Sequence, residues 1–372
     1  MRHSLLHLIV IYTVITGVVS LAWLALSLSG SRIDRLQPQA SCRHLKGMNR
    51  KQMRFCRRNI EQMESIRAGA QTAYGECQFQ FHKRRWNCSM IDPLTKEVFG
   101  DAILREGTRE AAFVHAISAA GVAYRVTRDC SKGLIEKCGC DQSVHRRRNE
   151  QFSWSGCSDN VRYGIAVSRE FVDAGERGRN QSNQRRIMNL HNNNAGRQVL
   201  EANMRKECKC HGLSGSCDMK TCWESMPSFR EVGTIIKDKF DGATEVAIIE
   251  ADNKPTMVRK NVQFKRHTKA DLVYLDTSPD YCEPDPTRGV LGTHGRLCNV
   301  SSHGIDGCEL AIFGSTRFPS NMSYPFSSSA VIEDSKHVLG ALWIGAIASF
   351  TTVVEWIARR AKGSLKITFA SD

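Results

Sequence analysis

The sequence predicts a mainly α, disulfide-rich (α+β) fold: a helical N-terminal bundle that carries a disulfide-laced β-hairpin, followed by an incomplete cysteine-rich C-terminal domain. Three observations support this fold class. Apolar residues recur at helical spacing between residues 40 and 240. Twelve of the 15 cysteines lie between Cys42 and Cys222. The densest group of four surrounds a segment rich in glycine and serine, which is typical of a tight reversal between two strands.

The N-terminus predicts entry into the secretory pathway. Arg2 and His3 precede an apolar run from Leu5 to Leu28, and small residues follow it, so residues 1–30 are predicted to be a signal peptide. The run is also long enough to span a bilayer, which makes an uncleaved signal anchor the alternative. Fifteen cysteines in 372 residues fit an oxidising compartment. The 52 Lys and Arg against 38 Asp and Glu favour a polyanionic partner, and this compartment excludes nucleic acid.

Residues 40–245 are expected to form the helical N-terminal domain. The clearest helix begins after Thr108, a good N-cap, with Glu110 in the first turn, where a negative charge suits the helix dipole. The apolar spacing predicts helices at residues 51–70, 108–126, 158–172, 185–204 and 228–240. Beyond them, residues 246–270 are predicted to be a linker. Residues 271–311 are predicted to be a partial cysteine-rich C-terminal domain. Glycine and proline are frequent in this segment and leave little room for regular structure.

The cysteine cluster at 208–222, CKCHGLSGSCDMKTC, allows several chemistries. Two nested bridges would lace a hairpin and make its tip rigid. A zinc site from Cys208, Cys210 and His211 is disfavoured, since Cys-x-Cys lacks the usual ligand spacing and thiols oxidise in a secreted chain. A serine nucleophile is disfavoured too, because the elbow pattern needs glycine where Ser216 stands. A purely structural knuckle is the simplest alternative.

Several segments together resemble the Wnt family of secreted, lipid-modified morphogens. The similarity spans roughly residues 40–311, and within the family it is greatest to the Wnt-4 type. Besides the cluster, it is carried in family order by CQFQFHKRRWNCS (77–89), GTREAAFVHAISAAGVAYRVTRDCS (107–131), KCGCD (137–141), WSGCSDN (154–160) and NLHNNNAGR (189–197).

The resemblance implies a secreted ligand for Frizzled receptors that acts in Wnt signalling, development and cell fate, and not an enzyme. It implies that the acyltransferase Porcupine attaches a palmitoleoyl group to Ser214, and that this lipid enters the cysteine-rich domain of Frizzled. No metal and no cofactor beyond the acyl group are expected. Further expected partners are low-density-lipoprotein-receptor-related co-receptors, the carrier Wntless and heparan sulfate proteoglycans. The residues expected to contact the receptor are Lys209, His211, Leu213, Met219 and Lys220.

The resemblance also implies a disulfide pairing. The expected pairs are Cys77 with Cys88, Cys130 with Cys138, Cys140 with Cys157, Cys208 with Cys222, Cys210 with Cys217, Cys42 with Cys56, and Cys298 with Cys308. Cys282 is then predicted to be unpaired, because its family partner would lie in a stretch that this chain replaces.

Surface chemistry adds two further expectations. Basic clusters at Arg54, Arg57 and Arg58, at 82–85, at 145–148 and at 177–186 are predicted to bind sulfated glycosaminoglycans, with dispersed solvated charge as the alternative. Sequons at Asn87, Asn180, Asn299 and Asn321 predict glycosylation.

Residues 312–372 are unlike the family. The second receptor-binding finger is expected to be absent, which would give a truncated ligand that signals poorly or competes. Residues 338–354 carry no charge and precede basic residues, so a membrane-tethered adhesion or structural protein is the other alternative. A splicing or gene-model origin of this tail is the favoured explanation. The expected location is the extracellular space and matrix.

Overall fold

The computed structural model divides the chain into two compact units. The first comprises Met1–Cys77 and Ile91–Ser278, and the second comprises Gln78–Met90 and Pro279–Asp372. The described residues are 21–30, 33–89, 106–144, 152–177, 183–251, 254–285, 288, 290–293, 296–299, 302–304, 307, 329–332 and 364–365.

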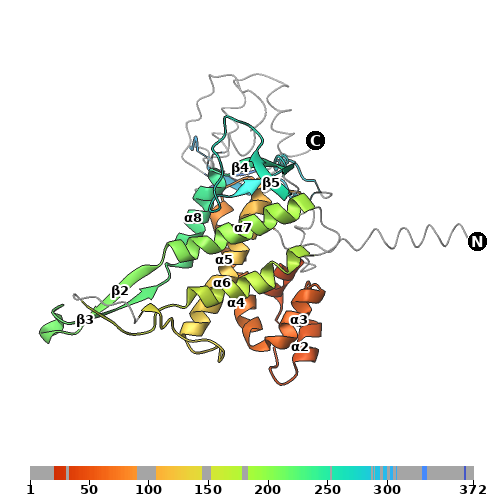
Figure 1. Cartoon of the computed structure of the whole chain (residues 1–372). Coiled ribbons are helices and arrows are strands. Elements are labelled where there is room, and N and C mark those ends of the chain that lie inside the picture. Colours follow the sequence, from red (N-terminus) through yellow and green to blue (C-terminus); the bar gives the residue numbers. More distant parts are fainter. Residues whose placement is uncertain are drawn as a thin grey trace, which may run out of the picture. The chain divides into compact units, whose positions relative to one another are not determined.

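The first unit is built around helix α5 (Figure 1). Alanine and glycine make α5 narrow, and 18 of its 23 residues are buried, so neighbouring helices approach it closely. It packs against α6, α7 and α8. The helices are α2 (Pro38–His44), α3 (Arg50–Arg58), α4 (Met63–Phe81), α5 (Arg109–Ser131), α6 (Val161–Val172), α7 (Asn183–Ala202) and α8 (Phe229–Asp241), with short 3-10 turns η1 (Ala22–Leu28), η2 (Ile60–Gln62), η6 (Gly175–Arg177) and η7 (Leu213–Gly215).

The helix caps follow the sequence signals. Thr108 caps α5 by accepting a hydrogen bond from the Ala111 backbone N–H. Ser228 and Glu231 form a capping box at the start of α8. The prediction of a single helix over residues 51–70 is wrong. Helix α3 ends at Arg58, and helix α4 begins at Met63. Asn59 causes the break, since its non-helical backbone lets its N–H close onto the Phe55 and Cys56 carbonyls.

The segment predicted to be a linker is instead part of the first unit. Strands β4 (Thr244–Ala251) and β5 (Lys254–Arg259) pair antiparallel, and β4 also pairs in parallel with β6 (Val273–Tyr274). Met188 of α7, Val246 and Val273 form one buried cluster, so this sheet shares the core of the helices. The units divide at Ser278 and Pro279, later than the predicted boundary at 245–270.

Two predictions concern the ends of the chain: the signal peptide at residues 1–30 and the membrane segment at residues 338–354. Residues 21–28, within the predicted 1–30 signal peptide, belong to the folded core. In the second unit, β7 (Arg296–Asn299) pairs with β8 (Ser329–Ile332), which pairs with β9 (Ser364–Leu365). The predicted membrane segment 338–354 lies outside the described residues. Within the described ranges, no helix is both long and apolar enough to cross a bilayer.

Candidate functional site

Strands β2 (Arg205–Cys210) and β3 (Lys220–Ser225) form an antiparallel hairpin that extends away from α7 (Figure 1). Cys208 lies directly opposite Cys222 in the register, and the two are disulfide-bonded with a Cα–Cα distance of 4.1 Å. Cys210 and Cys217 form the second, inner bridge, with a Cα–Cα distance of 4.6 Å. The nested bridges fix both ends of the tip, which has no hydrophobic core of its own.

The tip, residues 211–219, holds Ser214 in a left-handed conformation. Ser214 has φ 56° and ψ 24°, and Gly215 follows with φ 81°. The Gly212 N–H donates to the Ser216 carbonyl at 2.8 Å and closes the loop. Ser214 is exposed, and its Oγ makes no hydrogen bond within the described part of the chain, whereas Ser216 Oγ donates to Asp218 Oδ2 at 2.6 Å. Of the two serines, Ser214 therefore offers the more accessible hydroxyl.

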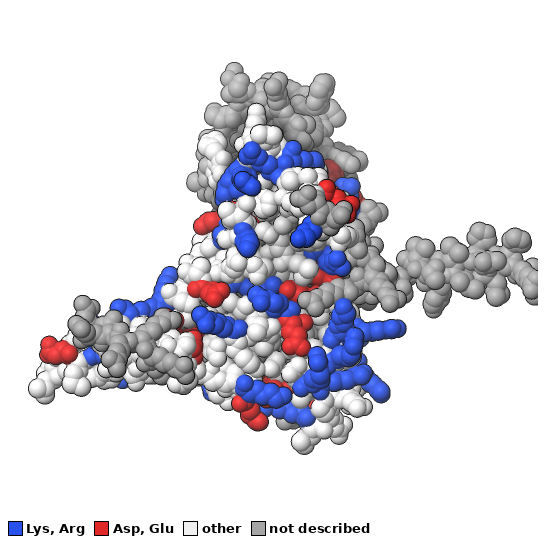
Figure 2. Space-filling view, in the orientation of Figure 1, with Lys and Arg blue, Asp and Glu red and all other residues white. Residues whose placement is uncertain are grey.

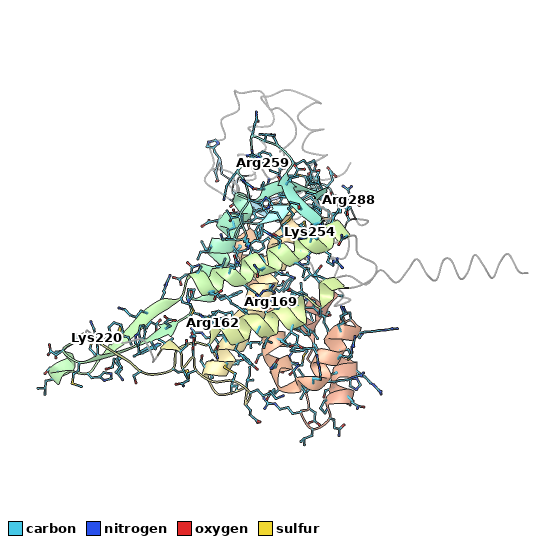
Figure 3. All side chains as sticks on the ribbon, viewed as in Figure 1. Arg162, Arg169, Lys220, Lys254, Arg259 and Arg288 are labelled. Atoms are coloured by element: carbon cyan, nitrogen blue, oxygen red, sulfur yellow. A yellow bond between two sulfur atoms is a disulfide. The ribbon has the colours of Figure 1, made fainter. Side chains whose placement is uncertain are left out.

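The expected receptor-contact residues lie on the same hairpin as Ser214. Leu213 and Met219 are 94% and 69% exposed, so two large apolar side chains are open to solvent near the tip. Lys209 is exposed on β2, and Lys220 begins β3 on the projecting hairpin (Figure 3). The His211 Nε2 lies 2.7 Å from Thr221 Oγ1, so the imidazole is held against β3. That interaction occupies the ring nitrogen a hydrolase would turn toward a serine nucleophile.

Two buried residues that the sequence did not single out attach the hairpin to the helices. Ser158 Oγ accepts a hydrogen bond from the Glu224 N–H, and Asp159 Oδ2 accepts one from the Met226 N–H at 2.9 Å. Asp159 Oδ1 also accepts from Ser131 Oγ at 2.6 Å. Asp159 thus joins the base of β3 to the end of α5. Both residues lie in the quoted WSGCSDN segment, but only the fold shows what they touch.

A second strand supports the hairpin from its side. Strand β1 (Ser153–Trp154) pairs in parallel with β3, placing Trp154 beside Cys222. The Lys206 ammonium lies 4.5 Å from the centre of the Phe152 ring, a cation–π contact. The tip is therefore presented by a braced three-stranded sheet.

Comparison with known proteins identifies the family. The profile of the wnt family matches residues 44–315, well over half of the chain. The chain belongs to the Wnt family. Protein Wnt-1 of Caenorhabditis elegans is 55% identical over 328 residues, covering 83% of this chain and 88% of that protein. Protein Wnt-3a is 46% identical in Mus musculus and 47% in Homo sapiens, each covering 73% of this chain and 77% of the relative.

The family fixes the general function. The chain is a secreted Wnt signalling ligand of the Frizzled-binding kind and not an enzyme. These relatives give no support for the Wnt-4 subtype or for a truncation, and the predicted loss of the second finger falls on residues that are mostly outside the described ranges. Among solved structures, human WLS in complex with WNT8A matches with 42% identity and a TM-score of 0.47, over 63% of this chain and 74% of that one.

Further disulfides of this Wnt protein connect segments around the helices. Cys42–Cys56 links α2 to α3, Cys130–Cys138 closes the end of α5, and Cys140–Cys157 closes the loop before α6. Cys77 and Cys88 each belong to a disulfide too. Burial raises the pKa of the half-buried Cys282 thiol to about 11. The side chains of Cys298 and Cys308, which the resemblance pairs, lie outside the described residues.

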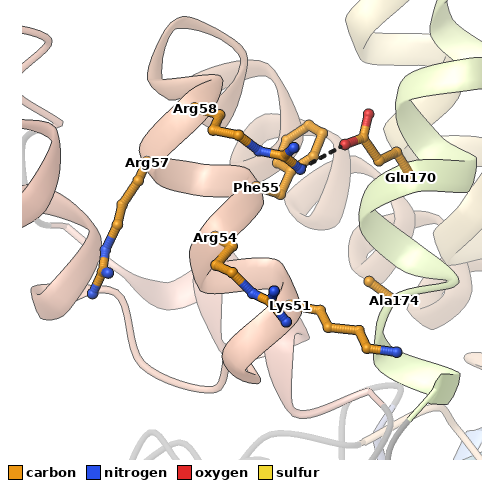
Figure 4. Close-up of a pocket in the computed structure, with 7 residues that line it drawn as sticks. All are labelled: Lys51, Arg54, Phe55, Arg57, Arg58, Glu170 and Ala174. Carbon is orange, nitrogen blue, oxygen red and sulfur yellow. Dashed lines mark hydrogen bonds and ion pairs between the residues drawn. The ribbon is translucent and has the colours of Figure 1, made fainter.

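Basic side chains gather over α3 (Figure 2). They line a cavity of about 570 Å³ between α3 and the end of α6, and its walls are Lys51, Arg54, Phe55, Arg57, Arg58, Glu170 and Ala174 (Figure 4). Arg58 pairs with Glu170 at 3.1 Å, but both side chains are more than half exposed. The attraction between the two charges is therefore weak. Of the other predicted basic clusters, residues 145–148 lie outside the described residues, and 177–186 lie partly outside.

Among the sequons, only Asn87 has a described side chain. Its Oδ1 accepts a hydrogen bond from Ser89 Oγ at 2.7 Å, so the acceptor residue and the hydroxyl residue of the sequon are in contact. Glycosylation at Asn87, Asn180, Asn299 and Asn321 stays a prediction.

Proposed function

We propose that Ser214 carries the palmitoleoyl group attached by Porcupine, and that this lipid enters the groove of a Frizzled cysteine-rich domain. The observation that carries the proposal is the exposed Ser214 hydroxyl, which has no hydrogen bond in the described structure and lies at the end of a doubly bridged hairpin. A narrow acyltransferase site can receive such a tip without meeting the helices. Leu213 and Met219 then extend the apolar contact beyond the lipid.

The acyl chain accounts for most of the expected affinity. Burying one methylene contributes about 0.8 kcal/mol, and a nanomolar complex requires about 12 kcal/mol. The neighbouring lysines Lys209 and Lys220 contribute mainly to orientation and association rate, because exposed charges add little net binding energy.

The test compares Ser214→Ala with Ser216→Ala, since the two serines are two positions apart in the same tip. Cells that express Porcupine are fed an alkynyl fatty acid, and the secreted protein is labelled by cycloaddition. Ser214→Ala is expected to abolish labelling and to weaken Frizzled binding by more than about 100-fold, because losing even about four buried methylenes removes about 3 kcal/mol. Ser216→Ala should keep the label. Labelling of Ser214→Ala at the wild-type level would contradict the proposal.

Other partners follow from the same assignment. One solved relative is human WNT8A in complex with WLS, and we extend that carrier to this chain. Co-receptors related to the low-density-lipoprotein receptor are the expected second receptor class for a Frizzled-bound ligand.

We also propose that the basic cavity over α3 retains the protein on heparan sulfate in the extracellular matrix. Arg54, Arg57 and Arg58 come from little more than one turn of α3, so their charges are close enough to act on one sulfated chain. Phe55 and Ala174 give the cavity an apolar floor.

The glycan proposal predicts a change in heparin affinity. Replacing Arg54, Arg57 and Arg58 by Gln is expected to lower the NaCl concentration that elutes the protein from heparin, since fewer counterions are displaced on binding. The matched control replaces the same three residues by Lys and should elute close to wild type. Equal elution of the Gln variant and the wild type would show that the charge is dispersed over the surface.

A further inference from the structure

Residues 21–29 are built into the first unit. Leu21 and Trp23 are fully buried, and Leu24 and Leu26 are 2% and 1% exposed. The 3-10 turn η1 spans Ala22–Leu28 and places these side chains inward. A segment with this degree of burial is part of the core and not a leader that is discarded.

Trp23 joins a row of aromatic rings that continues through two helices. Its ring lies edge to face on Phe171 of α6, with centroids 5.5 Å apart, and Phe171 packs in the same way on Phe55 of α3 at 5.5 Å. The loop between α2 and α3 lies directly on the backbone of η1, since a Cβ added to Gly47 would be 2.1 Å from the Ala22 carbonyl oxygen.

Side chains of helix α4 donate hydrogen bonds to backbone carbonyls at the C-terminal end of the same segment. Gln71 Nε2 donates to the Ser27 carbonyl at 2.9 Å, and Arg67 Nη1 donates to the Ser29 carbonyl at 3.1 Å. Cleavage after Ser29 or Gly30 would remove the Trp23 side chain from its contact with Phe171, together with the carbonyl acceptors that Gln71 and Arg67 use. Cleavage after Ser27 would remove Trp23 and the acceptor of Gln71.

We infer that signal peptidase cuts the bond between Ser20 and Leu21, so that the mature protein begins at Leu21 and keeps η1. Residues 5–16 then form an apolar stretch of the usual length for a secretory signal, about 7–15 residues. Val18 and Ser20 are the compact residues three positions and one position before the bond. The step is a hydrolysis: water adds OH to the Ser20 carbonyl carbon and H to the Leu21 nitrogen, and the peptide bond breaks.

The test reads the N-terminus directly. The full chain is translated in a cell-free system with microsomes, so that processing does not depend on folding or secretion. The α-amines are dimethyl-labelled, and the N-terminal peptide is identified by mass spectrometry. We expect the labelled amine at Leu21. An amine at any other residue, or an unprocessed chain, overturns the assignment.

A pair of matched variants checks which bond is recognised. Ser20→Leu puts a bulky residue directly before the inferred bond and should cause loss of the peptide that starts at Leu21. Ser29→Leu makes the same change at the alternative position and should leave that peptide unchanged. Loss of processing in Ser29→Leu, or normal processing in Ser20→Leu, overturns the inference. These results do not depend on the acylation of Ser214, which is tested separately.

Discussion

At the scale of single residues, the tip of the hairpin is where backbone geometry matters most. A left-handed conformation costs a non-glycine residue about 1–2 kcal/mol, and Ser214 adopts it with φ 56°. It persists because two disulfides and the bond from the Gly212 N–H to the Ser216 carbonyl determine the path of the loop. Ser214 is exposed in this conformation, and its hydroxyl makes no hydrogen bond within the described residues.

Gly212→Ala tests whether this geometry is needed for acylation. An added Cβ would lie 2.0 Å from Ser216 Oγ and 2.6 Å from the Ser216 carbonyl oxygen, so the loop must shift. We expect a lower fraction of acylated tip peptide, measured by mass spectrometry of the secreted protein. Gly139→Ala is the control, since an added Cβ at Gly139 meets nothing within 4 Å. Full acylation of Gly212→Ala would show that the enzyme accepts a rearranged tip.

At the scale of secondary-structure elements, the hairpin depends on its attachment to α5. Asp159 is 5% exposed and accepts hydrogen bonds from a backbone N–H of the hairpin base and from the Ser131 hydroxyl of α5. Arg128 also lies 3.5 Å from its carboxylate. Asp159 is therefore one of the groups, with Ser158 and strand β1, that hold the projecting hairpin on the helices.

Asp159→Ala should destabilise the protein. Removing the carboxylate leaves the Met226 N–H without its acceptor in a buried position, so the free energy of unfolding should fall by about 2–4 kcal/mol. Urea unfolding followed by circular dichroism measures this. Glu170→Ala removes a carboxylate from an exposed ion pair and should cost less than about 1 kcal/mol. Equal losses for the two variants would refute the anchoring role of Asp159.

At the scale of the whole molecule, buried polar groups connect the helices of the first unit. Arg197 of α7 pairs with Asp173 at 3.0 Å, and Asn193 donates to the same carboxylate. His115 of α5 lies 3.5 Å from Glu176, and both side chains are fully buried. Burial lowers the pKa of His115 below its ordinary 6.5, although Glu176 opposes the shift. His191 is shifted in the same direction, also mainly by burial.

These histidines predict that the fold weakens in acid. Below pH 6.5 the unfolded chain binds protons that the folded chain does not, so stability is complete above pH 6.5 and falls as the pH drops toward the lowered pKa values. The expected slope is at most about 1.4 kcal/mol per pH unit for each histidine. His115→Gln should flatten the pH dependence of the unfolding free energy, whereas His44→Gln, at an exposed position, should not. An unchanged slope in His115→Gln would contradict this account.

Features that depend on near neighbours could be predicted from the amino-acid sequence. The Thr108 cap, the apolar spacing of α5, the helix that begins after Ser228 and the hairpin at 208–222 are encoded within a few residues, so their patterns could be recognised. The family resemblance added Ser214 and the pairing of distant cysteines. The break at Asn59 escaped prediction because apolar spacing continues across it.

Contacts between segments far apart in the chain could be known only from the folded protein. Hydropathy alone assigned residues 21–28 to the leader, whereas Phe171 and Gln71 show that they belong to the core. The sheet of β4, β5 and β6 joined the helical unit because Val246 and Val273 meet Met188, which no local pattern indicates. Burial and hydrogen bonding depend on what folding brings together, so Asp159 and Trp23 acquired their roles only in the folded protein.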